Sequence, residues 1–73
     1  MSQVRIVVDA RGLRCPLPIL RLARIMRIEP AARYFALLSD DPATAVELQA
    51  WARETGHGVS AVGASFEIDR AAA

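Results

Sequence analysis

The sequence predicts an α/β fold of the α+β type: a two-layer sandwich with two helices packed on one face of a mixed four-stranded sheet. Short β-branched or aromatic segments and segments of helical periodicity follow one another in the order β-α-β-α-β-β. Each helical segment has one apolar face, as expected for a helix that covers one side of a sheet. With 73 residues, 53% of them hydrophobic, the chain is long enough for one small domain with its own core.

The first three elements predict a strand-helix-strand crossover. Residues 4–8 form the first strand, in which Val4, Ile6 and Val8 are expected to face the same way. Residues 16–28 form a helix, and residues 33–38 form a second strand, parallel to the first and joined to it by a right-handed connection. The core side of this helix consists of Ile19, Leu22, Ala23, Ile25 and Met26.

A second helix is predicted at residues 42–55. Asp41 is its expected N-cap, Pro42 its first residue and Gly56 its C-terminal stop. The face expected to meet the sheet consists of Ala45, Leu48, Trp51, Ala52 and Thr55.

A hairpin completes the predicted sheet. Its strands are residues 57–62 and 65–69, with the turn at residues 63–64. Residues 71–73 are expected to form a frayed tail, and residues 1–73 a single domain.

Cys15, the only cysteine, lies in the junction at residues 9–18, between the first strand and the first helix. Pro16 is expected to be the first helical residue, which makes Cys15 the N-cap. Unsatisfied N–H groups and the helix dipole would then favour an anion at Cys15, and Arg11 and Arg14 add positive charge. We therefore expect the thiolate, the nucleophilic form of cysteine, to be favoured. The alternative is that Cys15 is a small buried apolar residue, the usual role of a free cysteine.

Four other residues of this junction are expected to support the thiolate and the helix start. Asp9 suits a loop cap that accepts hydrogen bonds from nearby backbone N–H groups. Gly12 suits a backbone angle that other residues resist. Pro16 and Pro18 fix the start of the helix and hold the thiol rather than react.

The junction sequence DARGLRCPLP, residues 9–18, resembles the signature of the TusA-like (SirA-like) sulfur-carrier proteins, a sulfurtransferase family. The resemblance continues through residues 39–42 (SDDP) and 55–57 (TGH) and covers nearly the whole chain. It departs from the usual pattern in the turn before the second strand and in the second helix, and its final hairpin is short; these differences bear on which partner docks. The departing positions are Pro30, Ala31, Ala32, Glu47 and Gln49.

The resemblance implies the same two-layer sandwich and a single functional cysteine, Cys15. That residue would accept sulfane sulfur as a persulfide and relay it to an acceptor protein or small molecule, without a cofactor. The donor would be a protein of the cysteine desulfurase or rhodanese type, and both encounters would be transient. In the family such relays serve tRNA thiolation, sulfur oxidation, molybdenum-cofactor assembly or thiosulfate use, and the motif does not select among them.

Composition excludes several other classes. One cysteine rules out an internal disulfide, and one cysteine with one histidine leaves no zinc ligand set. The net charge of +1 and the few aromatic residues argue against direct nucleic-acid binding. The sequence shows neither a leader-like segment nor an apolar run of membrane-spanning length. We expect a soluble, monomeric, cytoplasmic protein without membrane insertion.

Two other functions remain open at this point. The chain is a non-enzymatic adaptor if an acidic partner binds the surface around Arg14, Leu17 and Arg21 while Cys15 is incidental. It is a thiol redox sensor if mild oxidant converts Cys15 to sulfenic acid or a mixed disulfide. Arg24 extends the candidate docking surface, although an arginine stripe on a helix is more often a solvated face.

Three residue groups have structural interpretations that we prefer to catalytic ones. His57 is expected to contact the C-terminus of the second helix rather than act as a base. The adjacent pair Asp40 and Asp41 is expected to cap the second helix rather than bind metal or transfer protons. Trp51 is expected to belong to the core.

Overall fold

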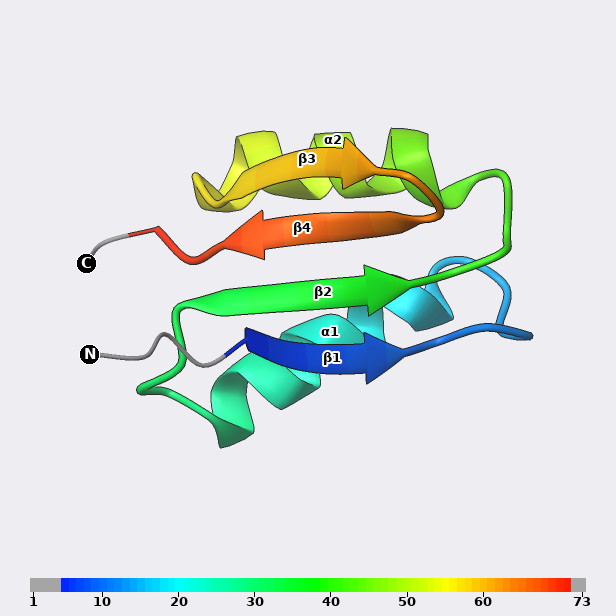
Figure 1. Cartoon of the computed structure of the whole chain (residues 1–73). Helices are drawn as coiled ribbons and strands as arrows, with labels where there is room; N and C mark the ends of the chain where they lie inside the picture. Colours follow the sequence, from blue (N-terminus) through cyan, green and yellow to red (C-terminus); the bar gives the residue numbers. More distant parts are fainter. Residues whose placement is uncertain (1–4, 72–73) are drawn as a thin grey trace.

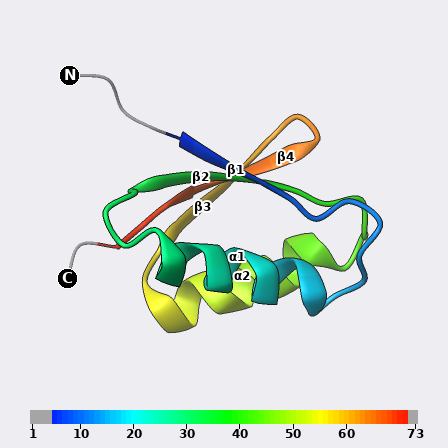
Figure 2. The same cartoon turned by 90° about the horizontal axis from the view of Figure 1, so that it is seen from below.

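The computed structural model describes residues 5–71 and contains six elements in the predicted order. These are β1 (Arg5–Asp9), α1 (Leu17–Ile28), β2 (Tyr34–Leu38), α2 (Thr44–Thr55), β3 (Gly58–Val62) and β4 (Ser65–Asp69). Both helices lie on the same face of the sheet, which confirms the predicted two-layer α+β fold (Figures 1 and 2). Neither helix in the described part of the chain combines the length and the apolar character needed to traverse a bilayer.

The sheet has the strand order β1-β2-β4-β3. β1 and β2 are parallel, as predicted, and the other two pairs are antiparallel. Because the carboxyl ends of parallel strands share one edge of a sheet, the loops that lead into α1 and α2 emerge side by side (Figure 1). The site described below lies where these two loops meet.

The buried side chains form a hydrophobic cluster between the sheet and the helices. Leu22 of α1, Leu48 of α2 and Phe35 and Leu37 of β2 are fully buried in it. Val8 of β1 is also buried and Ile6 packs against the cluster, so these two residues share a face as predicted; the third, Val4, lies outside the described range. The predicted core side of α1 is confirmed, since its five residues are buried or half-buried.

The predicted inner face of α2 needs a correction. Ala45 and Thr55 are exposed, whereas Thr44, which was not expected in the core, is fully buried. Leu48 and Trp51 do face the sheet, with Trp51 half-buried against the core. The inner face is therefore rotated towards Thr44 at the start of the helix.

Both helices begin later than predicted. α1 starts at Leu17 and not at Pro16, because the φ of −91° and ψ of 11° at Pro16 are not helical. α2 starts at Thr44, two residues after Pro42. Before it, the carboxylate of Asp41 accepts a hydrogen bond from the Ala43 N–H at 3.0 Å, which makes a separate turn ahead of the helix.

Two residues close the helices at the opposite end of the molecule: Arg70, which the sequence did not single out for this purpose, and Gly56, which it did. The Arg70 guanidinium donates hydrogen bonds to the carbonyl oxygens of Met26, Glu29 and Ala32, at 2.7 to 2.9 Å, and so caps the C-terminus of α1. Gly56 ends α2 with a φ of 82°, as predicted.

The predicted contact of His57 with the C-terminus of α2 is wrong, because its imidazole bonds elsewhere. Its Nδ1 instead accepts a hydrogen bond from the Ala71 N–H at 2.8 Å, and its ring packs beside Trp51 at a centroid distance of 5.0 Å. Ala71 is therefore held by a hydrogen bond rather than frayed, and the rest of the predicted tail, residues 72–73, lies outside the described range. The pKa of His57 is lowered by burial and, to a smaller extent, by the charge of Arg70.

Candidate functional site

Two aspartates of the loop after β2 hold the loop after β1 in place. Asp40 Oδ1 accepts a hydrogen bond from the Gly12 N–H at 3.0 Å. Asp41 Oδ2 accepts one from the Cys15 N–H at 2.7 Å. These bonds join residues that are 26 to 28 positions apart in the sequence, so the position of Cys15 depends on the second loop as much as on its own.

The sulfur of Cys15 lies at the end of a short series of hydroxyl groups. Cys15 is half-buried, and its Sγ lies 3.3 Å from the Thr44 hydroxyl. Thr44 Oγ1 in turn lies 2.7 Å from the hydroxyl of Ser39. Thr44 is fully buried at the first position of α2, so its hydroxyl is held at a fixed point beside the sulfur.

When the sulfur is ionised, each hydrogen bond in this series has a defined donor and a defined acceptor. A thiolate has no proton and can only accept, so the Thr44 hydroxyl must donate to it. Thr44 Oγ1 can then accept from the hydroxyl of the half-buried Ser39, which gives both hydroxyl groups a partner. The arrangement therefore provides a donor to an anionic sulfur without any ionisable base.

The predicted N-cap role of Cys15 is wrong. Pro16 occupies the cap position, and Cys15 lies one residue before it. Pro16 and Pro18 have no N–H, and the Leu17 N–H donates to the Arg14 carbonyl at 2.8 Å. The first turn of α1 thus offers Cys15 fewer free N–H donors than expected. The helix contribution that still favours an anion at Cys15 is the combined dipole of α1 and α2, which start at the same edge of the sheet (Figure 2).

The charged residues of the junction pair locally rather than with the sulfur. Asp9 caps its loop as predicted, because its carboxylate accepts the Arg11 N–H at 3.1 Å. It also forms an ion pair with the Arg11 guanidinium at 2.8 Å, and this contact lowers the pKa of Asp9 to about 2. Gly12 has the expected positive φ, 84°. Arg11 and Gly12 therefore shape the loop.

Asp41 is the charged group nearest to the cysteine backbone. Hydrogen bonds from the N–H groups of Ala43 and Cys15 lower the pKa of Asp41, and the charge of Arg14 adds to this effect. Arg14 thus acts on the carboxylate that anchors Cys15. Among residues 5–71, no three His, Cys, Asp or Glu side chains form a group that could hold a metal ion.

Ser39 and Thr44 were missed by sequence reasoning, as was the anchoring role of Asp40 and Asp41. The predicted parallel pairing of the first two strands was the available signal, because it already brings the two following loops to one edge. His57 lies just after the C-terminus of α2, whereas Thr44, the neighbour of Cys15, lies at the N-terminus. The 12 residues of the helix separate them by about 18 Å, so His57 is not a base for Cys15.

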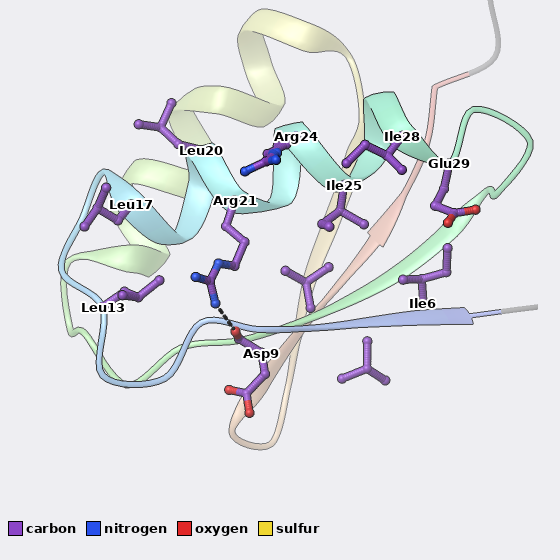
Figure 3. Close-up of a pocket in the computed structure, with 12 residues that line it drawn as sticks. Ile6, Asp9, Leu13, Leu17, Leu20, Arg21, Arg24, Ile25, Ile28 and Glu29 are labelled. Atoms are coloured by element: carbon purple, nitrogen blue, oxygen red, sulfur yellow. Dashed lines mark hydrogen bonds between the residues drawn. The ribbon is translucent and has the colours of Figure 1, made fainter.

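The tentative docking residues Leu17, Arg21 and Arg24 lie along one side of a groove between α1 and β1 (Figure 3). The groove has a volume of about 720 Å³. Arg21 reaches across it, and its Nη1 donates to the Asp9 carbonyl at 3.0 Å. All three side chains are exposed, so the predicted outer face of α1 is correct.

The fold and the site together define a class: a small α+β sandwich whose lone cysteine precedes a proline-rich helix start and is anchored by an Asp-Asp-Pro loop. The sequence model of the family described as "Sulfurtransferase TusA" matches residues 6–68. The chain belongs to this TusA family.

Curated relatives from three organisms support the assignment. "Putative sulfur carrier protein YrkF" of Bacillus subtilis is 36% identical over 70 residues, which is 96% of this chain and 38% of that protein. "Sulfur carrier protein TusA" of Allochromatium vinosum is 35% identical over 49 residues, 67% of this chain and 64% of that protein. A "Putative sulfur carrier protein" of Archaeoglobus fulgidus is 31% identical and covers 71% of each chain. This chain therefore spans less than two thirds of the length of the first two relatives.

Proposed function

We propose that the chain is a sulfur carrier that accepts sulfane sulfur on Cys15 as a persulfide and passes it on. The observation that carries the proposal is the position of the Cys15 sulfur, half-buried and 3.3 Å from a buried hydroxyl at the start of α2. Membership of the TusA family and the names of the relatives support the same role. On this proposal the protein is a sulfurtransferase of the carrier type, and its donor and acceptor bind transiently.

The loading step needs no oxidant. The Cys15 thiolate attacks the terminal sulfur of a donor persulfide, the bond between the two donor sulfurs breaks, and the donor leaves as a thiolate. One sulfur atom and its proton are thus transferred to Cys15. The Thr44 hydroxyl, as a donor, stabilises the attacking anion, and it does so again when unloading returns Cys15 to the thiolate.

Unloading repeats the same chemistry in reverse at the acceptor. An acceptor thiolate attacks the outer sulfur, and Cys15 is the leaving group. Because residues 5–71 contain no second cysteine, the persulfide cannot be resolved within the described chain as an internal disulfide. The outer sulfur therefore passes to another molecule.

Intact-mass spectrometry tests the proposal. The chain is incubated with a cysteine desulfurase and free cysteine, or with a rhodanese and thiosulfate. We expect a gain of one sulfur mass that a reductant reverses, and no gain in Cys15→Ser. If no donor changes the mass of the wild-type chain, the carrier proposal fails.

A second measurement separates the carrier from a redox sensor. Mild peroxide without a sulfur donor should leave the carrier at its original mass on the timescale in which a desulfurase loads it. A faster gain of one oxygen at Cys15 than of one sulfur would instead favour the sensor.

A further inference from the structure

β1 has a free edge in the described part of the chain. It lies at the end of the sheet and pairs with β2 alone among residues 5–71. In a parallel pair, the backbone groups of successive residues point to opposite sides of a strand. The Ala10 N–H donates to the Leu38 carbonyl on the β2 side, whereas the Asp9 carbonyl accepts from Arg21 on the other side. The backbone groups of Val7, two residues before Asp9, therefore point to the free edge.

A stripe of α1 faces this edge across the groove (Figure 3). Its apolar members, Leu17, Leu20 and Ile28, are 51%, 57% and 57% exposed, which is unusual for side chains of this kind in a row along one helix. Arg21 and Arg24 lie between them. The stripe thus combines apolar surface with two cations.

We propose that this groove binds an extended, acidic segment of a partner protein, which adds to β1 as a further strand beneath the α1 stripe. A groove bounded by a strand edge on one side and a helix on the other is the geometry of strand addition. The backbone groups of Val7 supply hydrogen bonds to the backbone of the segment, whereas the Asp9 carbonyl is already occupied by Arg21. The side chains of the segment that face α1 contact the exposed leucines and Ile28.

Charge selects the acidic partner. Among the residues that line the groove, Arg21 and Arg24 are its cations, and Asp9 and Glu29 are its anions. Asp9 is already paired with Arg11 at 2.8 Å, and Glu29 lies at the far end, just after α1. The half of the groove next to Cys15 is therefore cationic and complements carboxylates.

A second copy of this chain fits the groove less well. Pairing of two β1 edges in an antiparallel continuous sheet would place the two α1 stripes against each other. Arg21 and Arg24 of one copy would then meet the same residues of the other, and like charges in contact oppose association.

The groove also opens towards the reactive site, since Leu17 is two residues from Cys15. The inference deepens the proposed function and rests on it for the identity of the partner, which would be a protein that exchanges sulfur with Cys15. The docking itself does not need the sulfur chemistry and is measured without it.

Nuclear magnetic resonance of the full Cys15→Ser chain tests the docking. The probe is an acetylated, amidated peptide with threonine at every second position and with valine and glutamate alternating at the positions between, so that one face of the extended peptide carries both apolar and acidic side chains. We expect shift changes and slower amide exchange along β1 and in the α1 stripe, with the other sheet edge, β3, unchanged. The same peptide with lysine in place of glutamate should not bind.

Two sets of variants make the test specific. Arg21→Glu combined with Arg24→Glu should weaken binding of the glutamate peptide by about tenfold or more, from the loss and reversal of two exposed pairs. Arg27→Glu is the matched control, because Arg27 is exposed on the same helix but does not line the groove. Val7→Pro removes the outward N–H while leaving the pairing with β2, and should also weaken binding. If circular dichroism shows this proline variant unfolded, the arginine variants decide.

The proposal is overturned by an absence of shift changes with the glutamate peptide, by equal binding of the lysine peptide, or by changes centred on β3. Dimerisation through β1 in sedimentation runs would assign the edge to a second copy and would also overturn it. Persulfide loading of the wild-type chain is measured separately by intact mass, so failure of the docking and failure of the carrier function are distinguishable.

Discussion

Replacing Thr44 with valine removes the hydroxyl beside the Cys15 sulfur while keeping the shape of a fully buried side chain. The Ser39 hydroxyl then loses its partner at 2.7 Å, which should cost about 1 kcal/mol of unfolding free energy. For a domain of this size, that corresponds to a fall of about 4–8 °C in Tm. The loss of one hydrogen bond to an anionic sulfur, also about 1 kcal/mol, should slow persulfide loading about fivefold.

Thr44→Ser is the matched control. It keeps the hydroxyl but loses one buried methyl group, which should also destabilise the protein by about 1 kcal/mol. The two variants should therefore melt at similar temperatures, while the serine variant loads sulfur at the wild-type rate and the valine variant does not. Thermal unfolding followed by circular dichroism, together with loading rates from intact mass, gives both quantities.

Equal loading rates in Thr44→Val and the wild type would refute the role given to the hydroxyl, whatever the melting temperatures. Equal slowing in both variants would show that packing at the start of α2, and not the hydrogen bond, sets the rate.

Three further perturbations test other parts of the structure. Arg70→Ala should remove the cap on the C-terminus of α1 and lower the unfolding free energy, measured by chemical denaturation, by about 2–3 kcal/mol. A change under about 0.5 kcal/mol, which is the effect of an ordinary surface residue, would contradict the capping. The lowered pKa of His57 means that its contribution to stability is fully present above the ordinary value of 6.5 and is lost as the pH falls through the folded-state pKa. Melting temperatures should therefore fall on acidification below pH 6.5, and the fall should be smaller in His57→Gln. In Asp41→Asn one oxygen replaces two acceptors, so the Cys15 amide should exchange with solvent faster than in the wild type, and unchanged exchange would argue against the anchoring bond.

The sequence was sufficient for the elements and their order because the periodicity of both helices and the β-branched strands is strong. It misplaced both helix starts for a local reason. Proline suits the first helical position, but two prolines lie two residues apart at α1, and the structure places Pro16 at the cap and Pro18 inside the helix. At α2, the Asp41 side chain closes its own turn with Ala43 before the helix begins.

Cys15 could be identified as the candidate reactive residue from the sequence, but its surroundings could not. The anchor on the Cys15 N–H comes from Asp41, and the hydroxyl beside its sulfur comes from Thr44. Both follow β2, the second strand of the parallel crossover, and their side chains meet the cysteine only when β1 and β2 pair in register. Local sequence patterns predicted only that Asp41 caps the second helix, and they gave no indication that Thr44 lies beside the cysteine.

The pairing register of the sheet also fixes where the polypeptide enters and leaves. Arg5 is level with Tyr34, which is level with Asp69, while Cys15 follows the other end of β1. A module joined ahead of residue 5 or after residue 71 is therefore attached to the described part of the chain at the pole away from the thiol, and the four steps from Arg5 to Asp9 alone span about 13 Å. A fused donor or acceptor would have to fold its linker back past the whole length of the sheet to reach the sulfur, whereas a separate protein can approach it directly.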